Sequence, residues 1–198
     1  LYKELEGGAS WNHEKRELRL FAGEAEEELK FQMAHELAHL VSFDLVKRLG
    51  YVDRKGYPSN VPIWFLEGLA ECAAIKWAAE ADRGYYLTNR ALTNFKTDVE
   101  NGNSPIGTLN KVITREARKV HGYEYAAVGT FVEFLHRECG GSKTLVSVWV
   151  DAAEDGKLKE AIERHTGESL NSLKVKWEFF LKDWYEFKID GGGGEEKE

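Results

Sequence analysis

The sequence predicts an α+β domain that is mostly helical, and three observations support this prediction. The first segment, Leu1 to Ala22, places Leu18, Leu20 and Phe21 among charged residues, in the imperfect alternation of an edge strand. An acidic run from Glu24 then opens a long stretch with helical periodicity. Glycines separate further helical segments towards the carboxyl end. We therefore expect a small N-terminal sheet or edge strand followed by helices.

The expected elements follow one another with short connections. The first segment is expected to turn as a hairpin at Asn12-His13-Glu14. The first helix should run from about Glu24 to Leu49, where Gly50 offers a left-handed cap. After a loop at Tyr51–Val61, a second helix should run from Pro62, which suits a first turn, to about Asp82. Further helices are expected near Thr88–Glu100, Leu109–Val120, Tyr123–Arg137, Lys143–Ala153, Leu158–His165 and Ser169–Phe187, separated by Gly107, Gly122, Gly140, Gly156 and Gly167.

The composition is that of an ordinary folded protein. Hydrophobic residues make up 42% and charged residues 31% of the 198 residues, which excludes a fully disordered chain. We expect one domain over 1–190, with the sheet and the metal-binding helices in 1–83 and a helical subdomain in 84–190. The tail 191–198 reads GGGGEEKE and is expected to be disordered, because it has no apolar side chain to bury.

Charge and hydropathy argue against two classes of partner. The formal net charge is −7 and the basic residues are scattered, which argues against nucleic acid. No run of about 18 apolar residues exists, so no membrane insertion is expected. The chain starts at Leu1 and reads as an excised or processed product. Its compartment and oligomeric state stay open, although a secreted or cell-envelope location would suit such processing. Cys72 and Cys139 are expected to be buried thiols, with one disulfide as the alternative.

The stretch Phe31–Leu40 contains an H-E-x-x-H motif formed by His35, Glu36 and His39. Residues i and i+4 are neighbours on one face of a helix, so both imidazoles can reach one zinc ion. Glu36 is displaced by about 100° from His35 and can accept a proton beside the metal without being a ligand. Unpaired imidazoles would be costly to bury among the apolar neighbours. The motif therefore predicts a metal site at His35 and His39.

A third ligand is expected on the next helix. Glu67 lies in the segment WFLEGLAE, Trp64–Glu71, as one of few acids on an apolar helical stretch. A catalytic zinc site needs three protein ligands and an open position, and Glu67 is the candidate. The alternative is a solvated glutamate on the helix surface. Gly68 beside it would let another backbone approach closely.

The H-E-x-x-H motif followed by W-x-x-E-G-L-A resembles the gluzincin, or peptidase MA-like, zinc metallopeptidases. These are related to thermolysin and to the leukotriene hydrolase/aminopeptidase family. The resemblance implies a zincin-like metalloprotease domain, with zinc on His35, His39 and Glu67 and with Glu36 as general base. Two departures indicate a divergent branch. The spacing from His39 to Glu67 is longer than in the aminopeptidases, and Leu66 stands where thermolysin-like enzymes carry an Asn.

The resemblance extends to two further positions. Gluzincins often carry an acid four residues after the Glu ligand that hydrogen-bonds the first zinc His, and Glu71 stands there. The aminopeptidases also have a helix that opens with a Tyr, whose hydroxyl donates to the oxyanion. The segment Tyr125–Leu135 aligns Tyr125 with that residue. Because the family's glycine is shifted by one, to Gly129, Tyr123 remains an alternative.

The segment Gly8–Asn12 resembles the G-x-M-E-N strand of those aminopeptidases, whose Glu holds the free amino terminus of the substrate. Trp11 replaces that Glu and cannot neutralise an ammonium group, although it offers a cation–π face. We expect Trp11 and Asn12 to bind the substrate by strand addition, and the missing carboxylate favours internal cleavage. The alternative is an ordinary strand that matches by accident.

The remaining aromatic residues and histidines are expected to be structural. Trp177, Phe180 and Trp184 recur at helical spacing and are expected in the core. The histidines outside the motif are expected on the surface or in structural roles; they are His13, His121, His136 and His165.

Together these features predict a zinc metallopeptidase with one catalytic Zn²⁺. It would hydrolyse peptide bonds as an endopeptidase, by Glu-assisted attack of zinc-bound water. Its partner would be a peptide or protein substrate. Two other hypotheses stay open: an inactive gluzincin-scaffold module that binds peptides or proteins, and a hydrolase of a non-peptide substrate.

Overall fold

The computed structural model describes residues 10–12, 17–19, 26–52, 60–88, 90–114 and 120–187. The elements in these residues are β1 (Ser10–Asn12), β2 (Glu17–Arg19), α1 (Glu26–Arg48), α2 (Ile63–Thr88), α3 (Arg90–Glu100), α4 (Pro105–Thr114), α5 (Glu124–Glu138), α6 (Gly141–Asp155), α7 (Leu158–Thr166) and α8 (Leu170–Tyr185).

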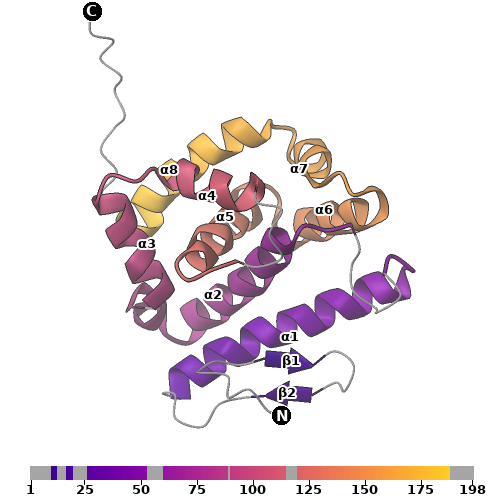
Figure 1. The fold of residues 1–198 in the computed structure, drawn as a ribbon, viewed down its shortest axis with the longest axis horizontal. Coiled ribbons are helices and arrows are strands. Elements are labelled where there is room, and N and C mark those ends of the chain that lie inside the picture. Colours follow the sequence, from indigo (N-terminus) through magenta and orange to yellow (C-terminus); the bar gives the residue numbers. More distant parts are fainter. Residues whose placement is uncertain are drawn as a thin grey trace, which may run out of the picture.

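Helix α5 lies at the centre of the molecule, with α2, α3, α4, α6 and α8 packed around it (Figure 1). Every residue of α5 from Ala126 to Leu135 is buried. Helix α1 packs on α2, and the β1–β2 hairpin lies against α1 on the side away from α2 (Figure 1). The arrangement places α1 at one edge of a helical bundle built around α5.

The α+β class expected from the sequence is wrong. The described residues are mostly helical, and their β-strands are two three-residue segments that pair antiparallel with each other, Trp11 opposite Leu18. A zincin-like fold with a sheet layer is therefore not supported. The physical reason lies in the composition of the first segment, which has too few apolar side chains among its charges to bury one face of a sheet.

The core is an aromatic cluster between α5, α8 and the helices around them. The fully buried Trp177 of α8 stacks on Phe95 at 6.1 Å and meets Phe131 edge-on at 5.7 Å, measured between ring centroids. Its indole Nε1 donates to the hydroxyl of Thr130 at 3.3 Å. Trp177 and Phe180 are buried as expected, whereas Trp184 is 36% exposed and its ring lies under the guanidinium of Arg137.

The expected end of α1 at Gly50 and the expected start of α2 at Pro62 are both confirmed. Gly50 follows α1 with φ +81°, which is the left-handed conformation expected for a cap. The carbonyl of Pro62 accepts hydrogen bonds from the backbone N–H of Phe65 and Leu66, so Pro62 opens the first turn of α2.

Several boundaries differ from expectation. Helix α2 continues to Thr88 rather than ending near Asp82, so Thr88 does not begin the next helix. Gly107 lies inside α4 instead of separating two helices, while Gly122, Gly140, Gly156 and Gly167 lie outside helices with positive φ, as expected. Most of the expected loop Tyr51–Val61, the expected hairpin turn and the tail 191–198 lie outside the described residues.

Both cysteines are free: Cys72 is buried and Cys139 is partly buried. Burial raises the pKa of the Cys72 thiol to about 12, with the nearby Glu133 carboxylate adding to the effect. The prediction of two free thiols is therefore confirmed, and burial is confirmed for Cys72 only. None of the described helices combines the length and the hydropathy that crossing a bilayer requires.

Candidate metal centre

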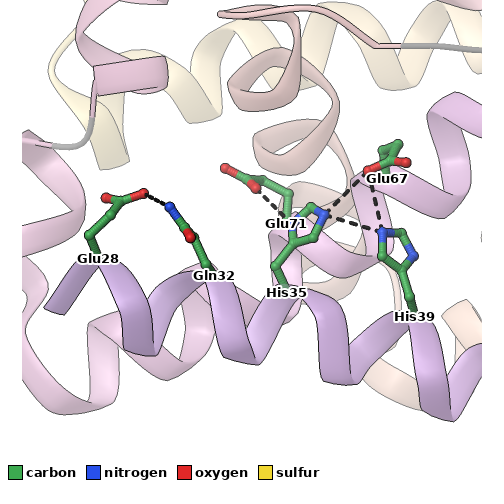
Figure 2. A network of polar contacts seen from close by, with 6 residues as sticks. All are labelled: Glu28, Gln32, His35, His39, Glu67 and Glu71. Carbon is green, nitrogen blue, oxygen red and sulfur yellow. Dashed lines mark hydrogen bonds and ion pairs between the residues drawn. The ribbon is translucent and has the colours of Figure 1, made fainter. Parts of the chain in front are cut away.

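Helix α1 presents its two motif histidines to α2. His35 and His39 are one turn apart, and their ring centroids lie 4.9 Å apart with the rings nearly perpendicular. Each side chain is 12% exposed. Figure 2 shows both rings pointing from α1 towards the acids of α2. The i, i+4 spacing thus brings the two imidazoles to one point, as the sequence predicts.

Helix α2 supplies a carboxylate at the same point. Glu67 Oε2 lies 3.2 Å from His35 Nε2 and 3.4 Å from His39 Nε2, and the two Nε2 atoms are 3.2 Å apart. Three atoms from two helices therefore form a nearly equilateral triangle (Figure 2). The group His35, His39 and Glu67 can hold a metal ion.

The size of this triangle fits a tetrahedral ion. Metal–nitrogen bonds of about 2.0–2.1 Å place the corners of a tetrahedron about 3.3–3.4 Å apart. Adjacent corners of an octahedron with the same bond lengths lie only about 2.8–3.0 Å apart. The observed edges of 3.2, 3.2 and 3.4 Å are closer to the tetrahedral values. The donor set, two imidazole nitrogens and one carboxylate oxygen, is one that zinc accepts.

Glu71 fixes the orientation of the first histidine. It lies one turn after Glu67 on α2, and its Oε2 is 3.1 Å from His35 Nδ1. The side chain of Glu71 is only 5% exposed. A proton held on Nδ1 by this carboxylate leaves the lone pair of Nε2 directed into the triangle. The hydrogen bond expected from the sequence between Glu71 and His35 is present.

The electrostatics of the site favour a cation. Burial alone would lower the pKa of His35, but its hydrogen bonds with Glu67 and Glu71 and their charges outweigh burial and raise the pKa to about 10. Burial would raise the pKa of Glu67, but its hydrogen bonds with His35 and His39 lower it to about 2. Two carboxylates thus surround the imidazoles, and in the absence of a metal a proton on His35 partly balances them.

Tyr125 of α5 lies beside this group. Its ring centroid is 6.0 Å from that of His35. Burial raises the pKa of the phenol above its usual range, and the charges of Glu67, Glu71, Glu36 and Glu124 raise it further. The hydroxyl is therefore protonated at neutral pH and available as a donor. The expected base, Glu36, lies on α1 directly after His35, and its side chain is partly buried.

The other expected site residues have different outcomes. Tyr123 directly precedes α5 and is partly buried against the core. Leu66, at the position where thermolysin-like enzymes carry an Asn, is buried in the core. The backbone of Trp11 and Asn12 forms β1, which lies against α1, but their side chains lie outside the described part of the chain.

Comparisons with protein-family models, curated proteins and solved structures find no match for this chain. The candidate metal centre therefore rests on the geometry of its own residues.

A polar pair next to the site, Gln32 and Glu28, was not predicted from the sequence. Gln32, one turn before His35, donates from Nε2 to Glu28 Oε1 at 2.9 Å (Figure 2). The Oε1 atom of Gln32 is buried and accepts no hydrogen bond from the residues that the structure describes. The signal was available, because positions 28, 32, 35 and 39 share one face of a helix with a period of 3.6 residues.

A second feature that the sequence did not indicate is the contact of Gly129 of α5 with Glu71. A Cβ atom placed on it would lie 2.3 Å from Glu71 Cγ and 2.8 Å from Glu71 Cβ. By contrast, the close approach expected at Gly68 is confirmed, since a Cβ there would lie 3.0 Å from the carbonyl oxygen of Val128 and 2.7 Å from Val132. No local pattern could have indicated the contact at Gly129, because it joins two helices distant in sequence.

Proposed function

We propose that this protein is a zinc-dependent peptidase that cleaves peptide bonds internally. The observation that carries the proposal is the triangle of His35 Nε2, His39 Nε2 and Glu67 Oε2, with Glu71 bonded to the rear of His35. Two histidines of an H-E-x-x-H helix and one downstream Glu form the ligand set of thermolysin-type zinc peptidases. The proposal therefore keeps the gluzincin-type site without the zincin-like sheet.

When bound, a zinc ion would supply Lewis-acid polarisation of the substrate carbonyl and acidification of a water molecule. His35, His39 and Glu67 would hold the ion, and a fourth position would stay open to substrate. Glu36 would take the proton of the attacking water and pass it to the leaving amine.

Tyr125 would stabilise the oxyanion that forms at the scissile carbonyl. Its raised pKa keeps the hydroxyl protonated, and a neutral O–H group is a hydrogen-bond donor. Its ring already lies against that of His35, so the donor and the ligand group are on the same side of α1. The partly buried position of both residues would limit the access of competing water.

The proposal of internal cleavage rests on the residue at position 11. A free amino terminus needs a carboxylate to neutralise it, and Trp11 occupies the position where the aminopeptidase motif carries one. A peptide extended on both sides of the scissile bond needs no such group. The proposed substrate is therefore a peptide or protein segment, bound in extended form.

The decisive experiment joins metal analysis to a matched substitution. Purified protein is analysed for zinc, iron and other metals by inductively coupled plasma mass spectrometry, and then incubated with a peptide library read by mass spectrometry. We expect about one zinc per chain. Glu36→Gln should keep the zinc and lose about 10²–10⁴-fold in cleavage rate, because the base is removed without changing the ligands.

Glu100→Gln is the matched control, since Glu100 is an exposed acid at the end of α3. It should cleave like the wild type. A chain that takes up no metal would rule out the metal centre. A zinc-loaded wild type that binds peptides without cleaving them would instead identify an inactive binding module. Unchanged cleavage by Glu36→Gln would remove Glu36 from the mechanism.

A further inference from the structure

Helix α5 approaches the metal centre through a position without a side chain. Gly129 lies one turn after Tyr125, so both residues share one face of α5. A Cβ atom on Gly129 would lie 2.3 Å from Glu71 Cγ, 2.8 Å from Glu71 Cβ and 3.3 Å from Ile75 Cδ1. The first two distances are shorter than real carbon–carbon contacts. The backbone of α5 is therefore in direct contact with the stem of Glu71.

This contact limits where the Glu71 carboxylate can lie. One end of the Glu71 side chain is attached to α2, and its carboxylate is bonded to His35 Nδ1. The stem between them is covered by α5 at Gly129, and the whole side chain is 5% exposed. Moving only the flexible tip would not relieve a clash that includes Cβ. Any side chain at 129 must therefore shift either α5 or the Glu71–His35 hydrogen bond.

We propose that Gly129 is a positioning residue of the metal centre, which acts through Glu71 to fix the ring of His35. The inference rests on the proposed metal function and adds to it the role of α5. Gly129 lets α5 press on Glu71, and Glu71 holds His35 with Nε2 directed towards His39 and Glu67. The same helix brings Tyr125 to His35 from the preceding turn.

A second glycine of this helix pair shows that the effect is specific. Gly68 of α2 also has no room for a Cβ atom, but its neighbours are Val132 and the backbone of Val128. Gly107 of α4 is a helical glycine whose added Cβ would meet only Ser104, at an ordinary 3.5 Å. Among these three glycines, Gly129 alone meets an acid bonded to a proposed ligand.

The test is a double-mutant cycle on zinc affinity, made from Gly129→Ala and Glu71→Gly, because only glycine at 71 removes both the Cβ and the Cγ atoms that a side chain at 129 would meet. Zinc dissociation constants are measured by competition with a chromophoric chelator. We expect Gly129→Ala to weaken zinc binding about 10–100-fold, the usual effect of losing a group that orients a ligand. In the Glu71→Gly background the substitution Gly129→Ala should leave the dissociation constant unchanged, because both clashing atoms of residue 71 are gone. Gly107→Ala is the control and should bind zinc like the wild type.

The melting temperatures give a second readout that does not depend on metal. Gly129→Ala should lower the melting temperature of the metal-free wild type. In the metal-free Glu71→Gly protein Gly129→Ala should raise the melting temperature, because alanine fills space and favours a helix more than glycine does. If Gly129→Ala alone does not fold, the double variant still decides, since the proposal requires that it fold.

The outcomes separate this inference from the proposed function. A wild type that binds no metal removes both. A wild type that binds zinc, with equal losses of affinity from Gly129→Ala in the two backgrounds or with no loss, removes only the role of Gly129. A double variant that fails to fold shows that Gly129 serves general helix packing, and it also overturns the inference.

Discussion

Two regions of this molecule bury carboxylates and balance them differently. In the bundle around α5, Glu133 accepts a hydrogen bond from Arg137 Nε at 2.7 Å and another from the hydroxyl of Tyr185. Between α1 and α2, Glu67 and Glu71 face the imidazoles of His35 and His39. Arginine keeps its charge at every physiological pH, whereas the charge of an imidazole depends on its surroundings.

The difference shows which region is complete by itself. The α5–α8 region neutralises its buried acid with a permanent cation and surrounds it with aromatic rings, so its stability needs no ligand. The α1–α2 region gathers two imidazoles and one carboxylate around one point, with a second carboxylate bonded behind His35, an arrangement that a divalent cation would balance. The aromatic core and the candidate metal centre thus lie on different helices, and α5 contributes residues to both regions.

The largest expected effect concerns the stability of the α5–α8 region. Trp177→Ala should lower the free energy of unfolding by about 3–5 kcal/mol, because it removes a fully buried indole from between Phe95 and Phe131. Urea denaturation measures the loss. Zinc affinity of the folded variant should stay unchanged, since α8 supplies no residue to the metal centre.

Trp184→Ala is the matched control on the same helix. Trp184 is 36% exposed and stacks with Arg137. Losing this cation–π contact should lower the free energy of unfolding by about 1 kcal/mol or less, in addition to the loss from the apolar area that the ring buries. If Trp177→Ala weakened zinc binding as much as it weakened the fold, the separation of the two regions would be wrong.

The next effect concerns the side of α5 that faces the metal centre. Tyr125→Phe should lower kcat by about 10²–10³-fold, or about 2.7–4 kcal/mol in the barrier, because the oxyanion loses a donor while the ring still packs on His35. Steady-state kinetics on a cleaved peptide give kcat and KM separately. Tyr123→Phe removes the hydroxyl of the alternative residue. A larger loss of kcat from Tyr123→Phe than from Tyr125→Phe would transfer the donor role to Tyr123.

The local parts of the metal centre could be predicted from the sequence, because they depend only on helix periodicity. His35 and His39 are neighbours at i, i+4 in any helix, and Glu67 and Glu71 repeat that spacing. The contact between Gly129 and Glu71 could not be predicted in this way. It depends on how closely α5 packs against α2, which side chains throughout the bundle decide.

The errors in the fold have the same origin. Alternation of Leu18, Leu20 and Phe21 with charges is a local strand signal, and β2 does contain Leu18. Whether such strands build a sheet layer depends on the apolar surface they find, which a local pattern does not report. The same holds for Trp177 and Trp184, which share helical spacing although only Trp177 lies inside the bundle.

The smallest expected effect is the stabilisation that the metal gives to its own region. Removing zinc with a chelator should lower the free energy of unfolding by about 2.7 kcal/mol when the free metal had been at 100 times its dissociation constant. Thermal melts with chelator, and again after zinc is restored, measure this change. Glu67→Ala should show a much smaller response, because it has lost one ligand of the triangle.

Hydrogen exchange shows where that stabilisation lies, and this gives the sharpest form of the comparison. A bound zinc ion would join α1 to α2 through His35, His39 and Glu67, so its removal should lower amide protection first in α1 and the facing turns of α2. The amides of α8 around Trp177 should keep their protection, because the side chain of Trp177 packs on aromatic rings of the bundle and α8 would not contact the ion. Equal loss of protection in α1 and α8 would mean that the metal stabilises the molecule as one cooperative unit. The two regions would then differ in chemistry but not in their contribution to stability.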